Sequence, residues 1–259
     1  MRAIRNALDA ARLTVVSALA VMLAMTSATR TLAQTSAAGS ITSASGAVQV
    51  QSPAGTANAG SGTALNVGDR IITGPGGHAV ITLTDGSQLE LGESSNLVID
   101  NHSLAPSGGR AATQVSLFGG VLRSVVNATG GARNFEVHTP NAVAAVRGTR
   151  WDTAYSDADA RPTFGDCRKF TDVVVYEGVV SVRNPNASNG EDVPAGYEVT
   201  VPCSISPLLP GPIGMTGAHS ASAGIPSVIG GVPPPSCPVC PPVQPPAPPP
   251  PPPMPPPGL

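Results

Sequence analysis

Hydrophobic residues between Gly39 and Cys203 recur at every second position, in short runs separated by turn residues. Within each run, apolar side chains alternate with polar or small ones, and Gly, Asn, Asp or Pro closes the run. A period of two places alternate side chains on opposite faces of a strand, so the pattern predicts an all-β domain. The clearest runs are 47–50, 79–84, 121–126, 135–138 and 179–182.

The joints between these runs indicate how the strands are connected. Asp85-Gly86 is a strong hairpin signal, because glycine tolerates the positive φ of a tight turn, and Glu177-Gly178 joins two further runs. The stretch 142–146 is the only one with helical character, and it is too short to form a stable helix. Strand–turn units that begin with glycine can stack as a solenoid or pair as a sandwich. We expect a single domain of short strands, either solenoid-like or a rolled β-sandwich.

The N-terminal residues are typical of an export signal. Arg2, Arg5 and Arg12 precede an uncharged, mostly apolar run over 13–25, and small residues end at Ala33. The apolar run is shorter than the ~20 residues that span a bilayer, although an uncleaved anchor is the alternative. We expect cleavage after Ala33, a linker over 34–44, and no transmembrane helix in the mature protein.

The C-terminal residues cannot build a core. Of the 29 prolines, 22 lie from Pro202 onward, and no Asp, Glu, Lys or Arg occurs over 204–259. Proline lacks the amide hydrogen that sheets and helices need, so a proline tract adopts extended polyproline II. We therefore expect a β-domain over 45–203 and a disordered tail over 204–259. That tail is either a spacer or a docking ligand for an aromatic groove.

Charge excludes one class of function. The chain has a single lysine, Lys169, and a formal net charge of −2. Removal of residues 1–33 leaves 10 basic and 15 acidic side chains, a net charge of −5. A nucleic-acid partner requires clustered Lys and Arg, so none is expected.

A series of short motifs follows in an order that resembles the FecR domain family. The segments are 67–74, 85–87, 118–122, 135–149, 175–182 and 195–201. The resemblance covers about residues 45–201, and its most specific part is the Thr-Pro and Val-Arg-Gly-Thr stretch within 135–149. The family-motif positions are Gly68, Asp69, Gly74, Asp85, Gly86, Thr139, Pro140, Arg147, Gly148, Thr149, Gly178 and Gly196.

The resemblance implies an exported sensing or protein-interaction module in the periplasm or at the cell surface. The best-known FecR-domain proteins are transmembrane regulators of iron uptake, which pass a signal to a cytoplasmic sigma factor. Only about 12 residues precede the apolar run here, so the cytoplasmic region that would hold a sigma factor is missing. The expected partner is an envelope or periplasmic protein. A structural surface protein that binds cell-wall glycan, with the tail as a spacer, is the alternative.

The residues 147–149 combine a guanidinium with a sharp bend. Arg147 offers a planar fork for a carboxylate or carbonyl cluster, and Gly148 permits the bend. The architectural alternative, which we favour, is that Arg147 and Thr149 satisfy loop backbone groups inside the domain. Trp151, the only tryptophan, is expected to pack in the core.

The four cysteines fall into two pairs. Cys167 and Cys203 bracket two predicted strands, and Cys237 and Cys240 lie in the tail as Cys-Pro-Val-Cys. Disulfides persist in exported proteins, and four cysteines allow three pairings. We favour Cys167–Cys203 and Cys237–Cys240.

Catalytic and metal motifs are not evident. The four histidines are dispersed without metal-binding spacing, and no nucleophile elbow occurs. We therefore expect a non-enzymatic protein without a cofactor or a metal site.

Overall fold

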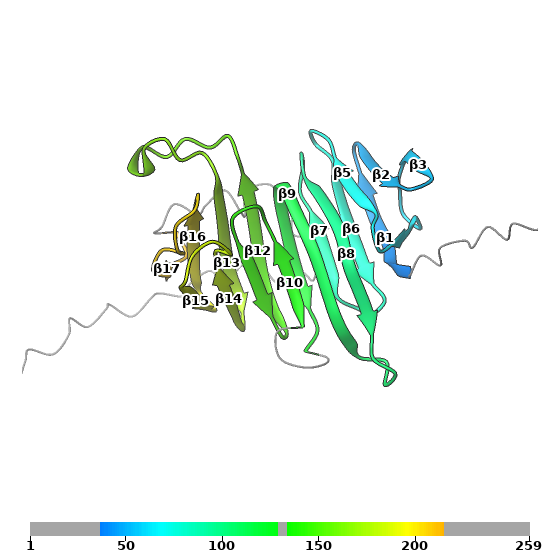
Figure 1. Ribbon diagram of the computed structural model, residues 1–259. Helices are drawn as coiled ribbons and strands as arrows, with labels where there is room; N and C mark the ends of the chain where they lie inside the picture. The colour runs from blue at the N-terminus through cyan, green and yellow to red at the C-terminus, as the bar shows by residue number, and fades with distance from the viewer. Residues whose placement is uncertain (1–36, 129–133, 215–259) are drawn as a thin grey trace, which may run out of the picture. The chain divides into compact units, whose positions relative to one another are not determined.

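A computed structural model describes residues 37–128 and 134–214. Within these residues the chain forms 17 strands, and its only helical element is the 3-10 turn η1 (Pro162–Phe164). The predicted all-β class is confirmed, and the segment 142–146 contains strand β11 (Val143–Val146). The strands lie in two facing layers, called layers A and B below (Figure 1).

Layer A contains nine strands, all antiparallel to their neighbours. In spatial order they are β4 (Ala64–Asn66), β1 (Ala37–Ser45), β6 (His78–Leu83), β7 (Gln88–Leu91), β9 (Arg110–Val126), β12 (Thr149–Ser156), β13 (Phe170–Glu177), β16 (Tyr197–Pro202) and β17 (Gly211–Pro212).

Layer B also contains nine strands, because β9 belongs to both layers. In spatial order they are β3 (Gly55–Asn58), β2 (Val48–Ser52), β5 (Arg70–Thr73), β8 (Asn96–Leu104), β9, β10 (Phe135–His138), β11, β14 (Val179–Arg183) and β15 (Gly190–Pro194). The β9–β10 pair is parallel and the other pairs of this layer are antiparallel.

Strand β9 crosses from layer B to layer A at Gly119-Gly120. Its first part pairs with β8 and β10, and its last part pairs with β7 and β12. Gly120 has φ +84°, and a Cβ there would lie 2.2 Å from the Ser95 hydroxyl oxygen. Only glycine fits this crossing, because both the backbone conformation and the close approach exclude a side chain.

The core lies between the layers and consists of the apolar side chains that point inward from alternate positions of the strands. Leu89, Leu117, Leu122 and Val175 belong to one contiguous apolar cluster. Trp151 is fully buried in it, as predicted, and meets the ring of Phe135 edge-on at 5.9 Å between centroids. Strands from both layers thus share one core.

The described fold corrects two expected boundaries. The expected linker 34–44 contains most of β1, which pairs with β4 and β6 through backbone hydrogen bonds that need no large apolar side chains. The expected tail 204–259 contains β17, which pairs with β16. The expected signal segment 1–33, the tail after residue 214 and the pair Cys237 and Cys240 lie outside the described residues.

The two predicted joints differ in role. Asp85-Gly86 closes the hairpin of β6 and β7, as predicted. Gly178, with φ +78°, connects β13 of layer A to β14 of layer B, and these two strands do not pair. The arrangement is therefore a rolled β-sandwich, in which the chain passes repeatedly from one layer to the other.

Candidate functional site: the outward face of layer B beside strand β15

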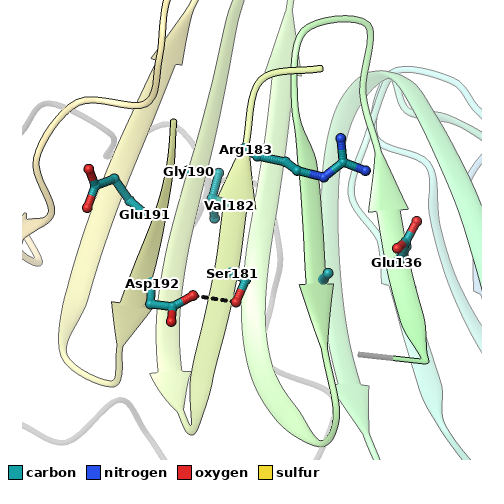
Figure 2. A pocket seen from close by; sticks show the side chains of 8 residues that line it. Glu136, Ser181, Val182, Arg183, Gly190, Glu191 and Asp192 are labelled. Carbon is teal, nitrogen blue, oxygen red and sulfur yellow. Dashed lines mark hydrogen bonds between the residues drawn. The ribbon is translucent and has the colours of Figure 1, made fainter. Parts of the chain in front are cut away.

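A shallow groove of about 490 Å³ lies on the outward face of layer B, at the side of the layer formed by its last strands in the chain. Strands β10, β11, β14 and β15 form it, and Figure 2 shows its lining residues. The lining residues are Glu136, Ala145, Ser181, Val182, Arg183, Gly190, Glu191 and Asp192, of which Val182 directs its side chain into the core.

One cross-strand row sets the width of the groove. Glu136 is opposite Ala145, Ala145 is opposite Ser181, and Ser181 is opposite Asp192. Ala145 and Ser181 have short side chains and form the bottom of the groove. Glu136 and Asp192 lie at the two sides of the groove (Figure 2). The Ser181 hydroxyl donates a hydrogen bond to the Asp192 carboxylate, which holds that side of the groove in place.

The groove has an acidic character. Three carboxylates, those of Glu136, Glu191 and Asp192, line it with one guanidinium, that of Arg183. The Glu136 carboxylate lies 2.6 Å from Nε2 of His138, which is the next outward residue on β10. A groove with more carboxylates than cations attracts cationic groups on a partner.

Strand β15 is the edge of layer B beside the groove. It pairs with β14 on one side, and within the described residues no strand pairs with its other side, since the neighbouring β16 pairs with β13 and β17. Its residues Glu191 and Asp192 are charged, and Glu191 leans over the edge in Figure 2. An open edge offers backbone N–H and C=O groups to an extended segment of another chain.

The family-motif positions lie elsewhere, at the turns. Asp69 is nearly buried between β4 and β5 and accepts a hydrogen bond from the backbone amide of Asn66, whereas the Gly68 amide donates to the Ile99 carbonyl. Gly74 donates to the Ala47 carbonyl, and Gly196 to the Val175 carbonyl. These contacts tie turns to neighbouring strands.

Thr139 and Pro140 form the turn between β10 and β11. The Thr139 hydroxyl accepts from the Ala142 amide and lies 2.6 Å from the hydroxyl of Thr171 on β13. This turn therefore joins the end of layer B to layer A.

Arg110 brings two of the motif segments together. Its guanidinium is buried and donates to the Asp85 carboxylate at 2.6 Å and to the Arg147 carbonyl at 2.8 Å. It also donates to the Ser87 hydroxyl and the Asn127 carbonyl. Burial by itself raises the pKa of Asp85, but the hydrogen bonds from Ser87 and Arg110 outweigh it and lower that pKa below its ordinary value.

The stretch 147–149 has an exposed side chain and a tightly packed backbone. Arg147 is exposed, and it is its carbonyl that accepts the buried hydrogen bond from Arg110. A Cβ at Gly148 would lie 2.6 Å from Cα of Ala128. Thr149 is buried against Gly178. None of the family-motif residues lines the groove.

The Cys167–Cys203 disulfide is present, as predicted. It links the loop before β13 to the end of β16, beside Asn141, whose amide group donates to the carbonyls of Lys169 and Val201. Among the described residues no group of three or more His, Cys, Asp or Glu is arranged to hold a metal ion. No helix of the described chain is both long and apolar enough to cross a membrane.

Comparison with known proteins identifies the motif-bearing part of the chain. Residues 69–181 match the family described as FecR protein. Residues 69–181 are a FecR domain. The groove begins inside the FecR domain, at Glu136, and ends beyond it, on β15. No curated protein matches the chain.

Two solved structures share a limited likeness with the chain. Both are crystal structures of a candidate anti-sigma factor from Parabacteroides distasonis, at 1.65 Å and 2.50 Å resolution. Each is 18% identical over 55% of this chain and 59% of its own length, with TM-scores of 0.43 and 0.42. The matched part of this chain thus spans less than two thirds of those structures.

Sequence reasoning did not find the groove residues. Glu136 and Ser181 are recognisable as outward positions of alternating strands, but alternation does not say which strands become neighbours. The β10–β11 pair and the β11–β14 pair bring residues 136 and 181 onto one face. Arg110 was also missed, because a lone arginine in a strand carries no signal of its buried partners.

Proposed function

We propose that this protein is an exported, non-enzymatic interaction module whose FecR domain and adjoining strand β15 bind an extended, cationic segment of an envelope protein. The observation that carries the proposal is the open edge of β15 beside an acidic groove. A segment added to β15 would form main-chain hydrogen bonds, and its alternate side chains would face the groove. Basic side chains there would meet Glu136 and Asp192.

The proposed role is sensing by capture of that partner in the periplasm or at the cell surface. The signal-like N-terminus supports export, and the FecR domain supports a relation to envelope signalling. Transfer of a signal across the membrane would then fall to the bound partner.

Site-specific photo-crosslinking in the producing cell tests the proposal. The full chain carries a photoreactive residue at Glu191 on the β15 edge, or at the exposed Gln49 on β2 of the same layer as the matched control. We expect one envelope protein to crosslink at position 191 and not at 49. The Ala145→Arg substitution, which fills the groove floor, should reduce that product at least tenfold.

A sedimentation assay with the same protein variants distinguishes partner binding from the glycan-binding alternative. A surface protein that binds cell-wall glycan would sediment with purified peptidoglycan or polysaccharide whether or not Ala145 is replaced. Equal crosslinking at positions 191 and 49, or a product insensitive to Ala145→Arg, would contradict partner binding at the β15 edge.

A further inference from the structure

The outward face of layer A carries charged side chains that are almost completely buried. Glu90, Asp152 and Glu198 are 0% exposed, and Arg123 is 9% exposed. These residues point away from the core, because Leu89, Leu91 and Leu122, their neighbours along the strands, point into it. On the outward face of layer B, by contrast, the Glu136 side chain is 33% exposed.

A small apolar cluster lies in the same face. Ala154 and Val174 are 7% and 2% exposed, and Val121 and Tyr176 pack against them. A groove of about 510 Å³ borders the cluster and is lined by Val121, Ala154 and Arg161, among others. Of the described elements, those that contact β9, β12 and β13 are their neighbours in layer A and strands of layer B.

The charges of this face form a ladder across neighbouring strands. Arg123 donates to the Asp152 carboxylate at 2.8 Å, and the Tyr176 hydroxyl donates to the same carboxylate at 2.8 Å. One carboxylate oxygen of Glu90 lies 2.8 Å from Nε2 of His78. Its other oxygen is buried without a hydrogen bond, and the Arg123 guanidinium is 4.0 Å away. A buried carboxylate oxygen is costly unless an N–H or O–H donor reaches it.

The chain itself supplies a segment that fits this face. The described part ends at Gly214, just after β17, which is the edge strand of layer A. From β17 to β12 is three strand spacings, roughly 15 Å, and the 18 residues 215–232 can extend up to about 60 Å. They contain no charged residue, include Ile225 and Ile229, and have only one proline.

We propose that residues 215–232 dock on the outward face of layer A. Their apolar side chains would cover Ala154 and Val174, and an amide or a serine hydroxyl would donate to the buried Glu90 oxygen that has no hydrogen bond. The proline tract 233–257 suits the site less well, because proline has no amide hydrogen to donate. If 215–232 docks in this way, the proline tract begins at a fixed point on the surface of the domain.

Hydrogen exchange of the full mature chain, residues 34–259, tests the docking. We expect the amides of 215–232 to exchange at least tenfold more slowly than those of the same peptide free in solution. The Ala154→Arg substitution should abolish this protection by placing a long side chain in the face. Ala145→Arg, the matched control on the outward face of layer B, should leave the protection unchanged.

Several outcomes would overturn the docking. Exchange of 215–232 at the free-peptide rate would do so, as would protection that survives Ala154→Arg. Protection that disappears on dilution would show that a second copy covers the face instead. If Ala154→Arg lowers the thermal midpoint by more than a few degrees, Val174→Asn replaces it with the same expected loss. Ala145→Arg should remove partner crosslinking without changing hydrogen exchange, and Ala154→Arg should change hydrogen exchange. Failure of the docking proposal is therefore distinguishable from failure of the proposed function.

Discussion

Arg110 shows how one side chain can hold distant turns of this fold together. It is 1% exposed and contacts Asp85, Ser87, Asn127 and the Arg147 carbonyl, which are separated by up to 62 positions in the sequence. Such a hub is stable only while every donor has its acceptor, since a buried ion left without its partner is strongly destabilising.

Replacement of Arg110 by methionine should therefore lower the free energy of unfolding by about 3–5 kcal/mol, because the buried Asp85 carboxylate loses its counter-ion. Urea denaturation followed by Trp151 fluorescence measures the change. The exposed Arg147→Met substitution, which keeps the carbonyl that Arg110 contacts, should change stability by less than about 0.5 kcal/mol. Equal losses in both variants would contradict the hub.

His102 predicts a pH dependence. Its ring lies between the hydroxyls of Thr84 and Thr113, at 2.6 Å and 2.8 Å. Burial is the main cause that lowers its pKa; the Arg110 charge lowers it further, and Asp85 opposes them. A pKa lowered on folding means that the unfolded chain binds the proton better. The contribution of neutral His102 should therefore be lost as pH falls below its unfolded pKa of about 6.5.

The measurement is the urea midpoint at pH 7 and at pH 5 for the natural chain and for His102→Gln. The natural chain should lose more stability on acidification than the variant, because glutamine does not titrate. His78 and His138 are common to both proteins, so the difference isolates His102. Parallel losses would contradict the assignment.

At the scale of elements, the disulfide fixes the loop between β12 and β13, which contains η1. Arg161 also holds this loop, because it pairs with Asp172 at the start of β13 and stacks over the Phe170 ring at 4.3 Å. The hydrogen bonds with Asp172 raise the pKa of Arg161, so the guanidinium stays charged. Two independent connections thus hold one long loop.

Removal of the disulfide by Cys167→Ser with Cys203→Ser should lower the free energy of unfolding by about 3–4 kcal/mol, given a sequence separation of 36. The cross-link restricts the unfolded chain, so its loss favours unfolding. Chemical denaturation without reductant measures the change. Cys237→Ser with Cys240→Ser is the matched control, and a comparable loss in the control would contradict a special role for the 167–203 link.

The elements also show what sequence could and could not predict. Alternation predicted the strands at 79–84 and 135–138, and Asp85-Gly86 predicted a hairpin, because these signals are local. Glu177-Gly178 resembles Asp85-Gly86 in sequence, because both connections use a glycine with positive φ. The Glu177-Gly178 connection nevertheless passes from layer A to layer B instead of closing a hairpin. Strand β1 was missed because Ser, Thr and Ala dominate it. The groove was not predicted because its two sides are joined by the long-range pairing of β11 with β14.

At the scale of the described domain, β9 makes the two halves of the chain depend on each other. The strands before β9 reach both layers, and so do the strands after it. Both sets pair with β9, and the apolar side chains of both belong to one cluster. A protein with a single core and a shared central strand is expected to unfold in one cooperative transition.

Replacement of Gly120 by alanine should reveal this coupling. A Cβ at φ +84° and 2.2 Å from the Ser95 hydroxyl oxygen strains the layer crossing, so we expect a loss of about 2–4 kcal/mol. Trp151 fluorescence reports on the second half of the chain, and far-ultraviolet circular dichroism reports on all strands. Both midpoints should shift together.

The neighbouring Gly119→Ala substitution is the control for the crossing. No atom lies within 4 Å of a Cβ at position 119, and φ there is not in the left-handed region, so stability should change little. If Gly120→Ala separated the two probes into distinct transitions, the halves on either side of β9 would be independent folding units. Coincident transitions would show that the two halves, joined by β9 and by one core, unfold as a single cooperative unit.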